Sequence, residues 1–337
     1  MPALAIAGAL AAQGASVFFI GGDRAERELV TGAGYELERL SVSGLDRHNP
    51  LKASTALARS GLATARARAL LRRRRATAVL GAGGYVAGPA GLAAVALRLP
   101  LVLCEADSQL GLTNRALAPF ARRVCLAFPI EGRDGARYLV TGRAVPAPRI
   151  DRAAARKQYG LGPRELMVFV FGGSLGARTI NDAALAGLDG ASFRVLHVTG
   201  RRDWPDFRRR AHGPHYELRE YLSPADFDVA LAACDLVVAR AGGSIFEIAA
   251  HGRPAILVPY PHASADHQST NAAWMVAGGA ATVIRDGELT GPRLASEVGR
   301  VISDSSRLEA MARASLALAK PDAARAIAAE VLAVAHP

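Results

Sequence analysis

The stretch of sequence that decides the fold is LMVFVFGGSLGA, residues 166–177, at the midpoint of the chain. Its first six residues are apolar and have the length of a buried strand, and a helical pattern begins near Ala177. The glycine turn between them is not a Walker sequence, because no Gly-Lys-Ser or Gly-Lys-Thr follows. A strand, a glycine turn and a helix start place backbone N–H groups and the positive end of a helix against an anion. The stretch therefore predicts a βα unit with a phosphate-binding turn.

Units of this kind recur along the whole chain. Before the midpoint, strand patterns at residues 16–20, 78–80, 99–104 and 123–127 alternate with helical patterns at 3–13, 51–75, 88–98 and 111–121. After the midpoint the scheme repeats, with strand patterns near residues 194–199, 235–239, 255–259 and 281–284. This alternation predicts an α/β fold with parallel sheets built from βαβ units.

The length of the chain and a proline-containing linker predict two domains. At 337 residues the chain suits two domains of about 150 residues each. The stretch 142–150 is punctuated by prolines and is typical of a linker. We therefore expect two doubly wound domains, residues 1–146 and 147–337, with a cleft between them. Ligands in such sheets bind at the carboxyl ends of the strands.

Charge and composition narrow the classes of partner. The chain has 41 Lys and Arg residues against 30 Asp and Glu residues, a formal net charge of +11. This balance indicates an anionic partner: a phosphorylated substrate, an anionic membrane or nucleic acid. Nucleic acid is the weaker choice, because aromatic residues make up only 6% and no zinc finger or RNA-binding motif is present. The sequence contains no apolar run of about 18 residues, so no transmembrane helix is expected. The N-terminus lacks the basic region of a signal peptide.

The cysteines and histidines predict no metal site. Cys104, Cys125 and Cys234 are scattered and odd in number, which is typical of buried thiols in a reducing cytosol. No His lies at ligand spacing from a Cys or from another His, so no zinc site is expected.

Two further glycine motifs follow apolar strands. The sequence GGYVAGP, residues 83–89, permits close approach of an anionic ligand, and an ordinary tight βα turn is an equally good interpretation. The sequence ARAGGSIFE, residues 239–247, would place amides at another helix start. Glu247 lies three residues after Ser244, which is capping-box spacing. Its carboxylate could instead accept hydrogen bonds from a ribose diol, and the two roles can coexist.

A polar loop and a basic helix complete the set of candidate segments. Residues 259–271, PYPHASADHQSTN, carry many side chains that can bond sugar hydroxyls. His262 and His267 lack a third good ligand, so a metal role is not expected there. In the predicted helix 51–75, apolar residues are interleaved with arginines: Arg66, Arg68, Arg72, Arg73, Arg74 and Arg75. This pattern is typical either of a solvated basic face or of an amphipathic helix that rests on anionic lipid.

Taken in order, these segments resemble the MurG family of bacterial cell-wall N-acetylglucosaminyltransferases, which make lipid II from lipid I. The likeness spans nearly the whole chain, and each motif alone is weak whereas the ordered set is specific. The shared segments are residues 43–45, 83–89, 111–114, 172–178, 240–244 with Glu247, 259–262, 266–268 and Asn271.

The resemblance implies a GT-B fold, with two Rossmann-like domains around a cleft and the last helix packed back on the N-terminal domain. It implies UDP-GlcNAc as donor, lipid I (undecaprenyl-diphospho-MurNAc-pentapeptide) as acceptor, and a β(1→4) bond formed with inversion. No cofactor or metal is implied, because helix dipoles with basic and hydroxyl groups can stabilise the leaving diphosphate. It also implies a peripheral protein on the anionic cytoplasmic face of the bacterial plasma membrane, with roles in peptidoglycan synthesis, cell shape and cell division.

The resemblance also implies roles for individual residues. The donor diphosphate would lie against Gly173, Ser174 and Gly176, with further contacts from Gly243 and Ser244. Glu247 would hold the ribose, Gln268 helped by His267 would bind GlcNAc hydroxyls, and Leu222 falls where the family pairs a backbone group with uracil. The acceptor would face Gly83, Gly84 and Tyr85, and the arginine-rich helix 51–75 would lie on the membrane.

The chain departs from the family pattern at three places. The family begins with a strand and a glycine loop whose histidine is usually proposed as general base. No residue here matches that histidine. A wrongly assigned start codon and a shortened protein are both consistent with this difference. The catalytic residue is therefore unassigned. Asp107 stands where the family has Asn, and it could accept a hydrogen bond or act as a base. Pro146 stands at a usual Arg position, for which Arg143 is the candidate replacement in the uridine pocket.

Two other functions stay open on the sequence. One is a glycosyltransferase with another lipid acceptor, such as diacylglycerol. The other is a protein that binds UDP-GlcNAc without turnover, because the first glycine loop is missing. The segments 83–89 and 266–268 favour the lipid I assignment.

Overall fold

The computed structural model describes residues 2–22, 26–40, 50–84, 86–210, 213–263 and 266–335, without the side chains of residues 26–27 and 50–59. The chain divides into two compact units. The first comprises Met1–Pro146 together with Lys320–Pro337, and the second comprises Ala147–Ala319. The C-terminal segment thus belongs to the first unit, and the resemblance implied that the last helix packs on the N-terminal domain.

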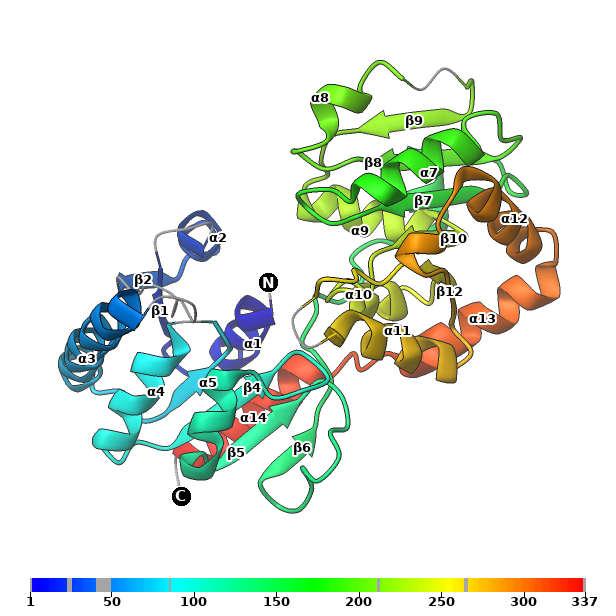
Figure 1. Ribbon diagram of the computed structural model, residues 1–337. Helices are drawn as coiled ribbons and strands as arrows, with labels where there is room; N and C mark the ends of the chain where they lie inside the picture. The colour runs from blue at the N-terminus through cyan, green and yellow to red at the C-terminus, as the bar shows by residue number, and fades with distance from the viewer. Residues whose placement is uncertain are drawn as a thin grey trace. The chain divides into compact units, whose positions relative to one another are not determined.

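The second unit is built on a six-stranded, entirely parallel sheet of order β12-β11-β10-β7-β8-β9 (Figure 1). Its strands are β7 (Met167–Phe171), β8 (Arg194–Val198), β9 (Tyr216–Arg219), β10 (Leu236–Ala239), β11 (Ala255–Leu257) and β12 (Ala281–Val283). The register aligns the last residues of all six strands in one row: Val283, Leu257, Ala239, Phe171, Val198 and Arg219. Every loop that follows a strand therefore starts at the same edge of the sheet.

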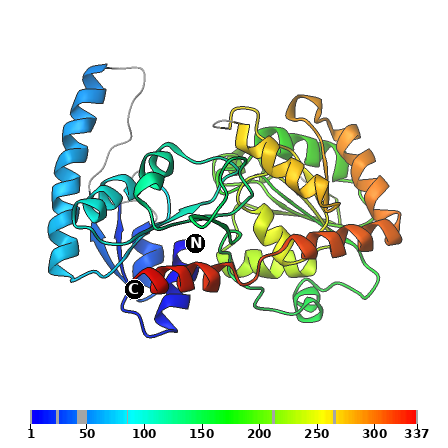
Figure 2. The ribbon, with the colours of Figure 1, turned by 90° about the horizontal axis from the view of Figure 1, so that it is seen from below.

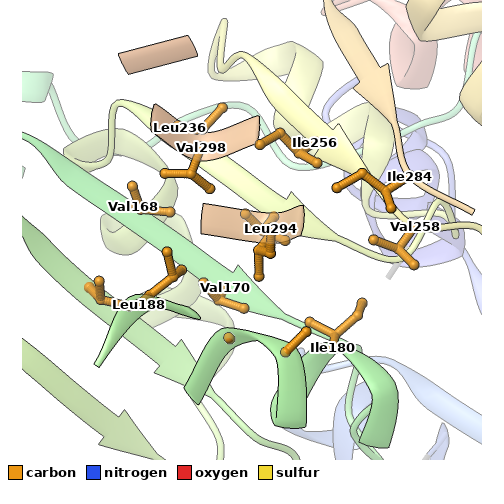
Figure 3. Close-up of a cluster of buried hydrophobic side chains, with 14 of the residues drawn as sticks. Val168, Val170, Ile180, Leu188, Leu236, Ile256, Val258, Ile284, Leu294 and Val298 are labelled. Atoms are coloured by element: carbon orange, nitrogen blue, oxygen red, sulfur yellow. The ribbon is translucent and has the colours of Figure 1, made fainter. Parts of the chain in front are cut away.

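Helices cover both faces of this sheet. They are α6 (Arg152–Gln158), α7 (Arg178–Leu188), α8 (Trp204–Phe207), α9 (Pro224–Ala233), α10 (Ile245–Ala250), α11 (His267–Ala277), η3 (Asp286–Glu288), α12 (Gly291–Ile302) and α13 (Ser305–Leu318). Side chains of α7 and α12 such as Ile180 and Leu294 form one core with Val168, Val170 and Leu236 of the strands (Figure 3). On the opposite face, the rings of Phe169 and Phe171 pack against Phe227 of α9. Alternate strand residues thus point to two cores, as expected for a sheet buried on both faces.

The first unit contains two parallel sheets. One pairs β1 (Phe18–Gly21) with β2 (Glu36–Arg39), and the other has the order β3-β4-β5-β6, with β3 (Val79–Gly81), β4 (Leu101–Glu105), β5 (Arg123–Leu126) and β6 (Tyr138–Val140). Its helices are α1 (Pro2–Ala11), α2 (Glu26–Gly32), α3 (Pro50–Arg73), α4 (Ala87–Ala96), α5 (Leu112–Leu117), η1 (Ala118–Phe120) and α14 (Ala323–Ala335). None of the helices in the described ranges combines the length and the apolar content that a bilayer span requires.

Two apolar cores lie on the two sides of these strands. Leu101, Leu103 and Val124 contact one core, which contains side chains of α3, α4 and α5. Val102 and Cys125, the alternate residues, contact the other core with Ile6 and Leu10 of α1 and Ile327, Ala328 and Val331 of α14. The C-terminal helix thus packs beside the N-terminal helix (Figure 2). The three cysteines are free thiols.

The strands predicted from apolar runs are all observed, with ends that differ by one or two residues. The elements for which the sequence analysis predicted no range include α2, β2, β6 and β9. The three strands among them lie at the edges of their sheets. The predicted helix over residues 51–75 ends at Arg73, so Arg74 and Arg75 lie beyond α3.

Candidate functional site

The order of strands in the second unit locates a crevice. From β7 the chain passes to β8 and β9 on one side, and it then returns to place β10 on the other side of β7. The loops that leave β7 and β10 therefore diverge to opposite sides at the carboxyl edge. Such a switch point is where open α/β sheets bind their ligands. The two loops here are the glycine turn 172–177 and residues 240–244, two of the motifs selected from the sequence.

The glycine turn follows a path that only glycine permits at several positions. Gly173 has φ +100° and Gly176 has φ +94°, both in the region that L side chains rarely adopt. A Cβ on Gly172 would collide with Ala177. The carbonyls of Ser174 and Leu175 accept hydrogen bonds from the backbone N–H groups of Arg201 and Arg202.

The amides of the same turn point to a ligand role. The N–H groups of Ser174 and Leu175 make no hydrogen bond to any described residue, and both residues are exposed. α7 begins directly after the turn, and no side chain caps its N-terminus. Carbonyls that are fixed and amides that are free are the arrangement that binds an anion such as a phosphate.

The second loop, residues 240–244, ends at the start of α10. Gly243 and Ser244 are half-buried. Ser244 occupies the N-cap position of α10, but its side chain makes no capping hydrogen bond. The capping box that the Ser244–Glu247 spacing suggested is therefore not formed by the serine, and its hydroxyl is available to a ligand. Glu247 lies half-buried in the first turn of α10.

The polar loop after β11 is held against the 240–244 loop. Asn271, buried in α11, donates from Nδ2 to the carbonyl oxygen of Ala241 at 3.0 Å. Oε1 of Gln268 accepts a hydrogen bond from the backbone N–H of Tyr260 at 3.0 Å, so its Nε2 group remains as a donor. His267, the first residue of α11, is half-buried, and Ser264 and Ala265 lie outside the described residues. The structure thus brings Gln268 and the 240–244 loop together.

Arg240 joins these loops to α7, a role for which the sequence contains no local signal. Its guanidinium donates to Asp286 Oδ1 at 2.5 Å, to Thr179 Oγ1 at 2.9 Å and to the carbonyls of Val258 and Pro259. Thr179 Oγ1 in turn donates to Asp286 at 2.7 Å. The side chains of Arg240 and Asp286 are nearly buried, so these charge-assisted bonds are protected from solvent. One side chain therefore fixes the ends of β10 and β11 relative to the first turn of α7.

The remaining donor-site predictions fall at different places. Leu222 is half-buried between β9 and α9, and its loop begins at the same carboxyl edge as the glycine turn. Arg143 lies in the first unit, between β6 and Pro146. Its uridine-pocket role stays a prediction. In the described residues, no group of three or more His, Cys, Asp and Glu side chains is arranged to hold a metal ion.

The predicted acceptor residues lie at the carboxyl ends of β3 and β4 in the first unit. Gly83 and Gly84 follow β3, are exposed, and have φ of +89° and +80°. Tyr85 lies outside the described residues, as do residues 43–45. Asp107 follows β4 and is half-buried, and its carboxylate makes no hydrogen bond or ion pair to a described residue.

Glu105 shapes the loop that carries Asp107. Its buried carboxylate accepts hydrogen bonds from the backbone N–H groups of Asp107 at 3.1 Å and Gly111 at 2.8 Å, and from Nδ2 of Asn114 at 2.9 Å. The loop 106–111 is thereby wrapped around one carboxylate. Glu105 is not among the residues selected from the sequence.

The arginines of the predicted membrane helix divide into two groups. Arg73 and Arg74 form ion pairs with Glu38 of β2, and Arg74 also pairs with Glu36. The hydrogen bond from Arg74 is the main reason that the pKa of Glu38 lies below its usual value. Arg66, Arg68 and Arg72 are exposed on α3 with no ion pair to a described residue, and Arg75 is exposed just beyond it.

Comparison with known proteins defines the class. The profile of the Glycosyltransferase family 28 C-terminal domain matches residues 167–327, and that of the Glycosyltransferase family 28 N-terminal domain matches residues 1–126. The fold is therefore that of a GT-B glycosyltransferase, with two Rossmann-like domains.

Individual relatives narrow the class further. The UDP-N-acetylglucosamine--N-acetylmuramyl-(pentapeptide) pyrophosphoryl-undecaprenol N-acetylglucosamine transferase of Moorella thermoacetica is 40% identical, with 97% of this chain and 93% of the relative covered. The protein of the same name from Rubrobacter xylanophilus is 39% identical, with 97% and 98% covered. The crystal structure of Acinetobacter baumannii MurG matches with a TM-score of 0.78 at 26% identity and covers 98% of this chain and 95% of its own. The chain belongs to the MurG family.

The Arg240 contacts predict a stability effect that charge alone does not explain. We expect Arg240→Lys to lower the free energy of unfolding by about 1–3 kcal/mol, because lysine cannot reach the same set of acceptors from one planar group. The matched control is Arg285→Lys, whose exposed ion pair with Glu288 predicts a change within about 0.5 kcal/mol. Urea denaturation measures both, and equal midpoints for the two variants would contradict the role of Arg240.

Proposed function

We propose that this protein is an inverting N-acetylglucosaminyltransferase that moves GlcNAc from UDP-GlcNAc to lipid I and forms lipid II in peptidoglycan synthesis. The observation that carries the proposal is the glycine turn with free amides at the switch point of the second sheet, flanked by the loops of Ser244 and Gln268. The curated relatives, at up to 40% identity along almost the whole chain, bear the name of this transferase.

The donor is assigned to the carboxyl edge of the second sheet. The diphosphate is assigned to the turn of Gly173, Ser174 and Gly176 and to Gly243 and Ser244. The donors of the turn are the amides of Ser174 and Leu175, whereas the N–H of Gly176 bonds to the carbonyl of Gly173 at 3.0 Å and shapes the turn. Free amides supply hydrogen bonds without reorganisation, so charge that develops on the leaving UDP is stabilised in place. The other donor contacts are Glu247 to the ribose, the backbone at Leu222 to uracil, Gln268 and His267 to the sugar, and Arg143 to the uridine.

The acceptor is assigned to the first unit, at Gly83, Gly84, Tyr85 and Asp107. In the reaction the acceptor hydroxyl attacks the anomeric carbon, the bond to UDP breaks on the opposite side, and the hydroxyl proton passes to a base. Asp107 is the candidate base, because its carboxylate is half-buried and makes no hydrogen bond to a described residue. The carboxylate of Glu105 accepts a hydrogen bond from the backbone N–H of Asp107 and thereby fixes the backbone that carries the Asp107 side chain.

The lipid tail of the acceptor requires a membrane surface, and we assign α3 and its neighbours to it on the cytoplasmic face. Arg66, Arg68 and Arg72 are exposed cations, and Leu62 lies one helical turn before Arg66 and is 56% exposed. Leu92 of α4, Leu112 of α5 and Phe120 of η1 are exposed as well. Exposed apolar side chains near unpaired arginines are the combination that binds an anionic interface.

A transfer assay tests the proposed function. We expect the purified protein to transfer radiolabelled GlcNAc from UDP-GlcNAc to a lipid I analogue in detergent, and to use UDP-glucose and UDP-galactose poorly. A preference for either of those donors would contradict the donor assignment. Transfer to diacylglycerol but not to lipid I, or donor binding without transfer, would contradict the acceptor or the catalytic assignment, respectively.

Donor affinity tests the ribose role of Glu247. We expect Glu247→Ala to weaken UDP-GlcNAc binding by about 1–3 kcal/mol, because it removes the acceptor for buried ribose hydroxyls. Isothermal titration measures the change, with the exposed Glu288→Ala as control for the loss of one carboxylate. Unchanged affinity in Glu247→Ala would exclude the ribose role.

Vesicle sedimentation tests the membrane surface. We expect Arg66→Gln, Arg68→Gln and Arg72→Gln combined to weaken binding to vesicles with anionic lipid at least about tenfold, since each basic residue near such a surface contributes about 1 kcal/mol. The control carries Arg285→Gln, Arg293→Gln and Arg313→Gln, exposed arginines of the second unit with the same total charge loss. Equal sedimentation of the two triple variants would show that α3 presents only a solvated face.

A further inference from the structure

A chain of buried polar side chains lies beneath the glycine turn, outside the contacts assigned to the donor. Asn181 of α7, His197 of β8 and Asp203 are all buried. Nε2 of His197 is 3.0 Å from Oδ1 of Asn181, and Nδ1 of His197 is 2.8 Å from the hydroxyl of Tyr216 on β9. Nδ2 of Asn181 donates to the carbonyl of Thr199 and to Oδ2 of Asp203, both at 2.9 Å.

The hydrogen bonds fix the protonation of this chain. Burial lowers the pKa of His197 to about 3, so the imidazole is neutral at physiological pH. Oδ1 of Asn181 can only accept, because Nδ2 is the donor to Thr199 and Asp203. Nε2 of His197 therefore carries the proton, and Nδ1 accepts a hydrogen bond from the hydroxyl of Tyr216. Each polar atom of the Asn181 amide therefore acts either as a donor or as an acceptor. A flip of this amide would break its hydrogen bonds to His197, Thr199 and Asp203.

The partners of Asn181 in this hydrogen-bonded chain of side chains contact the backbone of the glycine turn. A Cβ on Gly176 would collide with the carbonyl oxygen of Thr199, the same oxygen that Asn181 holds. A Cβ on Gly200, the next residue, would collide with the backbone N of Gly176. Asp203, the other partner of Asn181, also lies beside Gly176. The backbone of the turn thus rests directly on the two groups that Asn181 holds.

We propose that Asn181, His197 and Tyr216 are positioning residues that set the glycine turn in the geometry that binds the donor diphosphate. The inference rests on the proposed function, because it takes the diphosphate as the ligand of the turn. The inference predicts that changes in these residues weaken the binding of ligands that carry the diphosphate more than the binding of uridine. A change that displaces Asn181 lets Thr199 and the turn move, which misaligns the amides of Ser174 and Leu175 but leaves the uracil and ribose contacts in place.

Two substitutions of His197 separate the effect of its hydrogen bond to Asn181 from the effect of its hydrogen bond to Tyr216. In His197→Gln, the amide nitrogen can replace Nε2 and still donate to Asn181, whereas the acceptor for Tyr216 is lost. In His197→Asn, the shorter side chain can replace Nδ1 and accept from Tyr216, whereas the donor to Asn181 is lost. Both variants leave one polar group of the chain unpaired, so their stabilities should fall by similar amounts. Val301→Ala, a core change in α12, serves as a control for lost stability alone.

Affinities for UDP and for uridine measure the effect by isothermal titration and competition. We expect His197→Asn to weaken UDP binding about tenfold and uridine binding by less than about twofold, and His197→Gln to keep UDP affinity within about threefold of wild type. In the transfer assay, His197→Asn should raise the KM for UDP-GlcNAc and leave the KM for lipid I unchanged.

The outcomes distinguish this inference from the function on which it rests. Equal UDP affinity of His197→Asn, His197→Gln and wild type overturns the positioning role. Equal losses for UDP and uridine, or a loss in Val301→Ala of the same size, also overturn it, because they show general destabilisation. If wild type binds neither UDP nor UDP-GlcNAc, the proposed function itself fails.

Discussion

The candidate donor site depends on a contact between two backbones, at which Gly176 lies against Thr199 and Gly200. At this contact the end of β7 and the end of β8 approach so closely that no side chain fits between them. The carbonyls of Ser174 and Leu175 accept hydrogen bonds from the backbone N–H groups of Arg201 and Arg202, and the amides of Ser174 and Leu175 make no hydrogen bond to a described residue. The phosphate-binding role that we propose for the turn therefore depends on how the turn is anchored. The register of the sheet makes the contact possible, because Phe171 and Val198 end their strands side by side.

The central strands could be predicted from sequence because burial on both faces requires continuous apolar runs, such as residues 166–171. Three of the edge strands, β2, β6 and β9, could not. β2 reads Glu-Leu-Glu-Arg and β9 reads Tyr-Glu-Leu-Arg, and their charged residues resemble those of a loop. Such residues suit a strand with one free edge, where charge discourages pairing with other chains. β6 has only three residues, too few for a periodic pattern to be recognised.

The candidate site divides in a similar way. Glycines with positive φ and polar residues directly after strands are local signals, so the loops of Gly173, Ser244 and Gln268 could be selected from sequence. Arg240, Asn181 and His197 gave no comparable signal, because their roles arise from partners far away along the chain: Asp286 for Arg240, and Thr199, Asp203 and Tyr216 for the other two. A local pattern can also mislead. The spacing of Ser244 and Glu247 suggested a capping box, but the Ser244 side chain makes no capping hydrogen bond. Sequence thus selected the loops that form the candidate site, and the fold shows how these loops are held.

The central claim is that the amides of the glycine turn bind the donor diphosphate. The most direct test is to follow the backbone amide resonances of Ser174 and Leu175 by NMR in isotope-labelled protein during titration with UDP and, separately, with uridine. The account predicts that both amide protons move downfield with UDP, as they gain charged acceptors, and that uridine leaves them in place. If saturating UDP shifts other resonances but leaves those of Ser174 and Leu175 unmoved, the glycine turn is not the phosphate site.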